Sequence, residues 1–328
     1  MKMSKELRNL MVIVCALLVS LVSIPGYVCA DTFPSKPVDY VVVFAAGGST
    51  DVISRGLVEI ASRELGQPFV VLNKPGGGGS VGVSYWASAK PDGYTIGTFT
   101  AGATEIQPHL IKVPYDPLKD IEPIMQLFEY PQGFAVRADS PFKTFRELVE
   151  YVKQNPGKVS YGSSGTGGAP HIFTEIVAAK LNIKLTHVPF KGGAPAAAAV
   201  LGGHIMATPC ADFVPYVKGK TMRLLVVYNP KRLGDFPEVP TLRELGYDLA
   251  LSNYMGIGAP AGVPKDRLEK LYGVLKNARE DPGFKELLKK WSVEDVFRPG
   301  DELAKVIMEG YEDRGEIIEK LGLRKSSK

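Results

Sequence analysis

Residues 38–51 read Val-Asp-Tyr-Val-Val-Val-Phe-Ala-Ala-Gly-Gly-Ser-Thr-Asp, and the fold class follows from this stretch. The run 41–44 is apolar and mostly β-branched, which is typical of a strand that is buried on both faces. Gly47 and Gly48 end the run, because glycine takes a sharp turn without a Cβ penalty. The next three residues are of types that cap helices, and apolar residues then recur at helical spacing up to Leu65. The pattern predicts a strand, a glycine turn and a helix N-terminus.

The tip of such a unit offers unpaired backbone N–H groups and the positive end of a helix dipole, which together attract an anion. An ordinary strand-to-helix turn is the alternative for a single copy, and further copies weaken that alternative. A glycine-rich turn at 162–168 separates an expected strand at 157–161 from a helix that we expect to begin at Pro170. A third copy joins a strand at 185–190 to an alanine-rich helix at 195–201.

The N-terminus of the chain predicts a secretory signal peptide. Three basic side chains come first, and an apolar run from Leu10 to Ile24 follows them. Val28 and Ala30 then occupy the −3 and −1 positions of a cleavage site after Ala30. We therefore expect the mature protein to be periplasmic or extracytoplasmic. An uncleaved membrane anchor and a lipid attached to Cys29 are the alternatives that the sequence leaves open.

Charge and cysteine content limit the partners and the chemistry of the mature chain. The formal net charge is +4, and removal of the three basic and one acidic residues of the predicted signal peptide lowers it to +2. So small a charge provides no electrostatic attraction for nucleic acid. Cleavage also removes Cys15 and Cys29, which leaves Cys210 as the last cysteine. We expect no internal disulfide and a buried, apolar role for Cys210.

Strands and helices alternate along the rest of the chain, which predicts α/β domains with mostly parallel sheets. The segments around Pro131-Gln132-Gly133 read as strands with a break between them, so we place a crossing between two domains near residue 130. Residues 249–256 are the expected return crossing. The predicted division is a signal peptide at 1–30, a first domain made of 31–130 plus 254–328, and a second domain at 131–253.

Two glycine-containing loops follow other expected strands. Gly76–Gly79 come after a strand at 68–72 but lack the Gly-Lys-Ser/Thr ending of a phosphate loop. We expect the backbone there to pass close to another strand or to the ligand. A further polar loop is expected over Thr100–Thr104, after a strand at 94–99.

The sequence argues against metal and hydrolase chemistry. The four histidines are scattered, and no two of them have the i, i+4 spacing of a helical metal site. Gly162 and Ser164 begin the pattern of a nucleophile elbow, but Thr166 stands where its last glycine should be. A triad of Ser164 with His171 and Asp212 is therefore the weaker alternative to a binding protein without catalysis, cofactor or metal.

Seven short motifs occur in order along the mature chain and together are distinctive. They are Phe33-Pro-Ser-Lys-Pro37, Phe44-Ala-Ala-Gly-Gly-Ser-Thr-Asp51, Asn73-Lys-Pro-Gly76, Pro91-Asp-Gly-Tyr-Thr95, Pro114-Tyr-Asp-Pro117, His187-Val-Pro-Phe-Lys-Gly192 and Ala259-Pro-Ala-Gly-Val-Pro264. With these motifs the chain resembles the extracytoplasmic solute receptors of tripartite tricarboxylate transporters, the Bug or TctC family. The resemblance covers nearly the whole mature chain.

The resemblance implies a periplasmic-binding-protein fold, in which two α/β domains close on a small organic acid by a hinge motion near residues 130 and 252. It implies a monomer that delivers a mono-, di- or tricarboxylate to the large and small permease subunits of a membrane transporter. Presentation of the same ligand to a sensor kinase is an alternative that uses the same site. Tyr254, on the returning strand, either stacks on an aromatic acid or packs at the hinge.

The resemblance also implies that the loops 45–51 and 163–168 hold a ligand carboxylate, partly through ordered waters. Hydroxyl and backbone N–H groups would bind it without a buried arginine, whose desolvation is costly. Thr100–Ala101, Lys191–Gly192 and Asp212 would line the rest of the site. The predicted ligand-binding residues are Phe44, Ala45, Gly48, Ser49, Thr50, Asp51, Thr100, Ala101, Ser163, Ser164, Gly165, Thr166, Gly167, His171, Lys191, Gly192, Asp212 and Tyr254.

If Asp51 caps the helix that follows the first strand, the substitution Asp51→Ala should lower stability and ligand affinity together. Loss of a cap costs about 1 kcal/mol, and the same helix N-terminus forms part of the expected site. Urea unfolding and calorimetric titration of the same variant measure the two effects. A fall in affinity at unchanged stability would contradict the capping role.

Overall fold

The computed structural model describes residues 5, 33–320 and 322. The described residues from Lys36 onward form one compact unit. Apart from Lys5, the predicted signal peptide with its Cys29 therefore lies outside the described residues. Within the ranges that are described, no helix combines the length and the apolar character that a membrane span requires.

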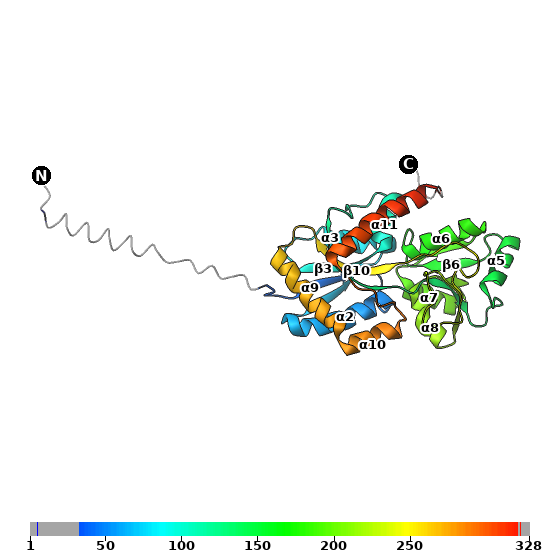
Figure 1. Cartoon of the computed structure of the whole chain (residues 1–328), viewed down its shortest axis with the longest axis horizontal. Helices are drawn as coiled ribbons and strands as arrows, with labels where there is room; N and C mark the ends of the chain where they lie inside the picture. The colour runs from blue at the N-terminus through cyan, green and yellow to red at the C-terminus, as the bar shows by residue number, and fades with distance from the viewer. Residues whose placement is uncertain (1–4, 6–32, 321, 323–328) are drawn as a thin grey trace. The chain divides into compact units, whose positions relative to one another are not determined.

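Six strands among the described residues form the first sheet: β1 (Val38–Val42), β2 (Phe69–Asn73), β3 (Thr95–Thr100), β4 (Ile121–Glu129), β10 (Tyr254–Pro260) and β11 (Arg298–Pro299). Their spatial order is β11-β4-β10-β3-β1-β2, and Figure 1 labels β3 and β10 at its centre. β1 pairs in parallel with β2 and β3, whereas β10 runs antiparallel to β3 and β4. β1 is almost entirely buried, as its β-branched sequence predicts.

The helical segments of this part are α2 (Ser49–Leu65), η1 (Gly77–Gly79), α3 (Ser80–Ala87), η2 (Gly102–Ile106), α4 (Gln107–Leu110), α9 (Lys265–Glu280), α10 (Pro282–Lys290) and α11 (Gly300–Lys320). α2, α9 and α10 pack together, and α11 packs against β4 and η2. In Figure 1 these two groups lie on opposite sides of β3 and β10. We call the first sheet with these helices the first lobe.

Five strands among the described residues form the second sheet: β5 (Gly133–Arg137), β6 (Ser160–Ser163), β7 (Thr186–Pro189), β8 (Ala207–Thr208) and β9 (Met222–Val227). Their order is β7-β6-β8-β5-β9, with β6 parallel to β7 and β8, and β5 antiparallel to β8 and β9. The helical segments here are α5 (Phe145–Gln154), α6 (Ala169–Leu181), α7 (Gly193–Leu201), η3 (Ala211–Phe213) and α8 (Val214–Lys218). We call this part the second lobe.

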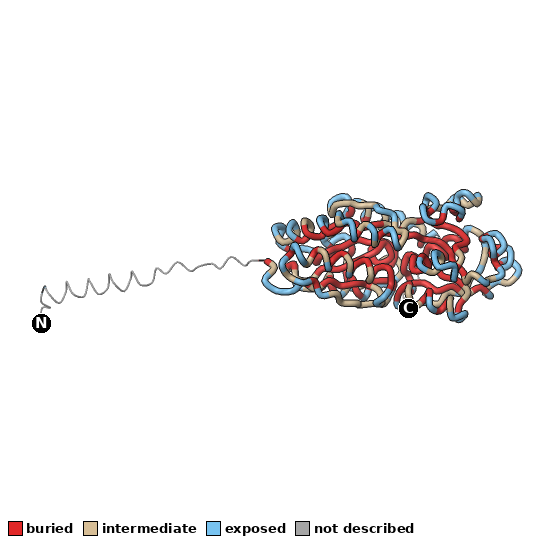
Figure 2. The backbone as a smooth tube through the Cα atoms, turned by 90° about the horizontal axis from the view of Figure 1, so that it is seen from below, coloured by how far each residue is buried: buried red, intermediate tan, exposed pale blue. Residues whose placement is uncertain are grey.

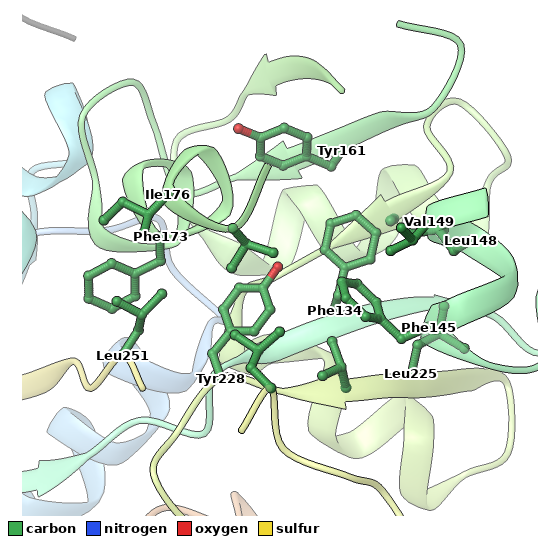
Figure 3. Close-up of a cluster of buried hydrophobic side chains, with 14 of the residues drawn as sticks. Phe134, Phe145, Leu148, Val149, Tyr161, Phe173, Ile176, Leu225, Tyr228 and Leu251 are labelled. Carbon is green, nitrogen blue, oxygen red and sulfur yellow. The ribbon is translucent and has the colours of Figure 1, made fainter. Parts of the chain in front are cut away.

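Buried strands run through the interior of the compact unit and exposed helical surface surrounds them (Figure 2). In the second lobe, the core contains Phe134 and Tyr161 with ring centroids 6.3 Å apart, and Phe173 lies on the buried face of α6 (Figure 3). Each fully buried aromatic side chain contributes about 1.5–3 kcal/mol by leaving water. This packing fixes the direction of α6, and therefore the position of its N-terminus.

The structure corrects the prediction of mostly parallel sheets, because both sheets are mixed. Four of the antiparallel pairs involve β10 or β5, the strands that follow the passages of the chain between the sheets, and the fifth joins β11 to β4. β8 and β11 have two residues each, too few to show a periodic pattern in the sequence. The polar loop expected at 100–104 is also wrong, since η2 continues the chain helically from Gly102.

Two connections carry the chain between the sheets. The first lies between β4 and β5, and the second precedes β10. They run side by side, because Tyr130 N donates a hydrogen bond to Asn253 O at 2.8 Å. Asn229 ties them further, since its Oδ1 accepts from Gln132 N at 2.6 Å and its Nδ2 donates to Tyr130 O at 3.0 Å. The domain limits given above stay a prediction.

Glu105 lies in η2 and is almost completely buried against α11. Tyr254 Oη donates a hydrogen bond to Glu105 Oε1 at 2.6 Å, and a Cβ built on Gly310 of α11 would overlap the carboxyl group. Burial raises the pKa of Glu105 from 4.5 to about 7, although the Tyr254 hydrogen bond and the charge of Arg314 oppose that rise. The folded protein therefore holds this proton more tightly than the unfolded chain does.

The raised pKa makes Glu105 a source of pH-dependent stability. Because the folded state binds the extra proton between pH 4.5 and about 7, this contribution is present below pH 4.5 and is lost as the pH rises through that window. Glu105→Gln removes the titrating group, so the variant should gain stability relative to wild type between pH 5 and pH 8, by up to about 3 kcal/mol. Urea unfolding of both proteins at the two pH values measures the gain. A difference that is the same at both would contradict the assignment.

Candidate functional site

A small cavity lies between the first and second lobes. Its free volume is about 30 Å³, so the two lobes leave little open space between them. The lining residues come from strand ends, helix N-termini and the two connections. They are Phe44, Ala45, Gly48, Ser49, Thr50, Thr100, Tyr130, Gln132, Ser164, Pro170, Gly193, Cys210, Ala211, Asp212 and Asn253.

The structure brings eight of the sequence-predicted residues into this lining. They are Phe44, Ala45, Gly48, Ser49, Thr50, Thr100, Ser164 and Asp212. Most come from the ends of strands that point at the cleft, where open α/β sheets bind ligands. The first glycine turn therefore lies where the sequence predicts it, beside the cavity and at the start of α2.

Asp212 of the second lobe reaches the N-terminus of α2 in the first lobe. Ser49 N donates a hydrogen bond to Asp212 Oδ1 at 2.8 Å, and the Ser49 hydroxyl lies 3.5 Å from Oδ2. A Cβ built on Gly48 would lie 2.9 Å from Oδ1, and one on Gly193, at the start of α7, would overlap Oδ2. The anion at the predicted helix N-terminus is thus a carboxylate of the protein itself. Burial raises the pKa of Asp212, and the hydrogen bonds from Ser49 oppose that rise.

Asp51 does not line the cavity, and the prediction that it caps α2 is wrong. The N-cap is Gly48, because the backbone becomes helical at Ser49. The Asp51 carboxylate instead accepts hydrogen bonds from Gly47 N and Asn73 Nδ2, both at 2.9 Å, and from Arg55 Nε at 3.0 Å. Burial favours a higher pKa, but these hydrogen bonds outweigh it and hold the pKa of Asp51 below its usual value. Asp51 therefore fixes the shape of the glycine turn, and the loss expected for Asp51→Ala keeps its direction.

Ser163 and His171 lie behind the cavity lining. The Ser163 hydroxyl is 2.7 Å from His187 Nε2, and the ring of His171 stacks on His187 with centroids 3.8 Å apart. Gly167 N donates a hydrogen bond to His171 Nδ1 at 3.0 Å, while Asp212 accepts from Ser49. In this part of the structure it is Ser163 that contacts a histidine, whereas the triad considered above needs Ser164 to contact His171.

The second glycine loop forms the rim of the cleft. A Cβ built on Gly78 would lie 2.5 Å from Gly168 N, and Gln107 Nε2 donates a hydrogen bond to Thr166 O at 2.5 Å. Gly78 therefore passes close to a loop of the second lobe, whereas the sequence predicted another strand or the ligand as the neighbour of Gly76–Gly79. Both lobes meet again where Ala45 N donates to Lys191 O at 3.0 Å.

Several of the predicted ligand-binding residues lie in the rim of the cleft or in the hydrophobic core and do not line the cavity. Gly165, Thr166 and Lys191 line a separate groove, and Gly167 and Gly192 take positive φ angles in the two loops. Ala101 is buried in the core of the first lobe. Tyr254 packs edge-on against Phe99 with ring centroids 6.3 Å apart, which places it in the core. α6 begins at Ala169, so Pro170 is its second residue and lines the cavity.

Sequence reasoning missed seven lining residues: Tyr130, Gln132, Pro170, Gly193, Cys210, Ala211 and Asn253. Tyr130 Oη lies 2.7 Å from Thr50 Oγ1, which joins a connection to the start of α2. The predicted crossings could have indicated Tyr130, Gln132 and Asn253, because a segment that passes between two lobes borders the cleft. Cys210 is buried, as expected, and burial raises the pKa of its thiol to about 12.

The lining of the cavity contains one acidic side chain and several neutral polar side chains. Asp212 is the acidic residue in the lining, and no lysine, arginine or histidine is found among the described residues that line it. Gln132 Oε1 and Asn253 Oδ1 are buried without a hydrogen-bond partner. Over residues 33–320 no group of three or more His, Cys, Asp or Glu side chains is placed to hold a metal ion.

Two mixed sheets, two connections and a cleft between lobes define a periplasmic-binding-protein fold, and solved structures agree. The periplasmic binding protein BugD has a TM-score of 0.85 at 33% identity, over 90% of this chain and all of that one. MatC from Rhodopseudomonas palustris, solved with malate, has a TM-score of 0.82 at 28% identity, over 87% of this chain and all of that one. An R. palustris protein solved with adipate has a TM-score of 0.83 at 25% identity, over 88% of this chain and 98% of that one.

The sequence comparisons identify the family. The profile of the tripartite tricarboxylate transporter family receptor, TctC, matches residues 53–323. The UPF0065 protein in the gbd 5′ region of Cupriavidus necator is 38% identical over 309 residues, which cover 93% of this chain and 94% of that protein. The chain belongs to the TctC receptor family, as its motifs predict.

The contact of Asp212 with Gly193 predicts a steep cost for a single methyl group. Gly193→Ala should destabilise the protein by about 1–3 kcal/mol, because the new Cβ overlaps the carboxylate in a packed site. Gly273→Ala is the matched control, since a Cβ there meets nothing within 4 Å inside α9, and it should stabilise by about 0.5–1 kcal/mol. Urea unfolding measures both. Equal free energies of unfolding for the two variants would show that the Asp212 carboxylate does not pack against Gly193.

Proposed function

We propose that the protein is an extracytoplasmic receptor that captures a small organic acid between its lobes and delivers it to a tripartite tricarboxylate-type transporter. The observation that carries this proposal is the cavity between the lobes, which is lined by neutral hydrogen-bond donors. The hydroxyl groups of Ser49, Thr50, Tyr130 and Ser164 belong to that lining. Such donors hold a carboxylate without the desolvation cost of a buried arginine.

The relatives support a carboxylate as ligand. Two proteins of the same fold were solved with malate and with adipate. The cavity is small and lies between the lobes, so an acid of that size must enter when the lobes are apart, and the lobes then close over it. The two side-by-side connections at residues 130 and 253 are the natural hinge, because they are the strands of chain that both lobes share.

The remaining parts of the proposal follow from the sequence. Export by a signal peptide cleaved near Ala30 places the receptor outside the cytoplasm. The protein acts as a monomer, without catalysis, and its partners are the large and small permease subunits of the transporter. The predicted domain limits describe the two bodies that move against each other.

A thermal-shift screen tests the ligand class. The panel contains citrate, succinate, malate, adipate, aspartate, nicotinate, benzoate and terephthalate. An acid present at about 100 times its dissociation constant should add about 2.7 kcal/mol of stability, which is a clear shift in melting temperature. No shift with any acid of the panel would contradict the proposal.

The hydroxyl groups of the lining supply a second, independent test. Ser164→Ala should weaken the acid found in the screen about five- to tenfold, because a hydrogen bond contributes about 1 kcal/mol. Ser88→Ala removes a hydroxyl from an exposed position at the end of α3 and should leave the affinity unchanged. Calorimetric titration measures both, and equal effects of the two substitutions would refute the role of Ser164.

A further inference from the structure

We propose that the cavity selects acids that also carry a protonated amino group, and that Asp212 receives this group together with Gln132 and Asn253. This inference rests on the proposed function, since it names the chemical class of the ligand for the same site. It depends on three features of the cavity, which are its charge, its unpaired acceptors and its remaining donors.

The charge of the cavity disfavours a simple anionic acid. Asp212 is buried in the lining, and no cationic side chain stands among the described lining residues to balance it. An added carboxylate would put a second negative charge into the same small, largely dehydrated space, where like charges repel strongly. An ammonium group brought in by the ligand would neutralise the carboxylate of Asp212, so a zwitterion enters without net charge.

The unpaired acceptors match the same group. Gln132 is 1% exposed and Asn253 is 5% exposed, and the side-chain oxygens of both have no hydrogen-bond partner. The amide nitrogen of Gln132 donates to Pro131 O at 3.3 Å, which leaves its oxygen as the unpaired atom. A buried acceptor without a donor costs about 1–3 kcal/mol. A carboxylate cannot relieve that cost, because it has no hydrogen to donate.

Asp212 keeps accepting capacity for the ligand. Its Oδ1 accepts from Ser49 N at 2.8 Å, Oδ2 lies 3.5 Å from the Ser49 hydroxyl, and the carboxyl group also accepts from its own backbone N–H. Two carboxylate oxygens together accept about four hydrogen bonds. An ammonium group has three N–H donors, and Asp212, Gln132 and Asn253 supply three acceptors. A hydroxyl group on the ligand would satisfy one of them.

The other end of such a ligand also has partners. The hydroxyl groups of Thr50 and Ser164 lie in the same lining and can donate to the ligand carboxylate. Thr50 Oγ1 and Tyr130 Oη are 2.7 Å apart, so one of the two hydroxyls can donate outward while it accepts from the other. The cavity therefore offers separate partners for the two charges of an amino acid.

Matched pairs of acids test the inference with the wild-type protein, exported and processed by the cell that expresses it. The pairs are propionate and alanine, succinate and aspartate, and adipate and 2-aminoadipate, with lactate and malate as hydroxyl-bearing members. In the pair of fitting length, titration calorimetry should show the amino acid at least tenfold tighter than the acid without an amino group, with the hydroxy acid between them. An amino-free acid that binds as tightly as its partner would overturn the inference and leave the proposed function intact. Absence of binding by every acid would overturn both.

A substitution of Asp212, the proposed acceptor of the ammonium group, gives a second test. In Asp212→Asn the ratio of the two affinities within that pair should fall to threefold or less. Asp248→Asn removes the same charge from a side chain that is 93% exposed, and the ratio should keep its wild-type value there. Circular dichroism and thermal unfolding check that both variants fold. An unchanged ratio in folded Asp212→Asn contradicts the role of Asp212, and if that variant does not fold, the wild-type pairs decide.

Discussion

The hydrogen bond from Ser49 N to the carboxylate of Asp212 joins the two lobes at the centre of the cleft, and the local structure on both sides depends on it. α2 begins there, and both Gly48 and Gly193 lack a side chain where the carboxylate packs. A helix N-terminus favours a negative charge, so the attraction offsets part of the cost of burying Asp212. The sequence suggests that the N-terminus of α2 binds an anionic ligand, but in the structure it already binds the carboxylate of Asp212. The ligand must therefore bind beside it.

Local features of the fold could be predicted from the sequence because they depend on neighbouring residues. The β-branched run before Phe44 gives the buried strand β1, and Gly48 gives the start of α2. The apolar spacing of Ile172, Phe173 and Ile176 gives the buried face of α6. The antiparallel pairs could not be predicted in this way, because the direction in which β10 and β5 enter their sheets depends on the two passages of the chain between the lobes. β8 and β11 have two residues each, too few for a local pattern to reveal them.

The candidate site was predictable only where it lies on those local units. The start of α2 and Ser164 follow from glycine turns, but Gln132 and Asn253 belong to connections whose position depends on the whole fold. Asp212 and its partner Ser49 are 163 residues apart, so no local pattern relates them. For Tyr254 the sequence left open a ligand contact or packing, and the structure packs it against Phe99.

The rim of the cleft is built mostly from backbone groups, whereas ligand recognition depends on the side chains of the lining. Gly78 meets Gly168, Ala45 N meets Lys191 O and Gln107 Nε2 meets Thr166 O, so most of the groups that meet on closure are backbone groups that every residue possesses. The lining instead presents side chains such as Gln132, Ser164 and Asp212. Evolution or engineering can therefore exchange the lining to recognise another molecule while the closing surfaces stay as they are, which makes the fold a reusable frame for new specificities.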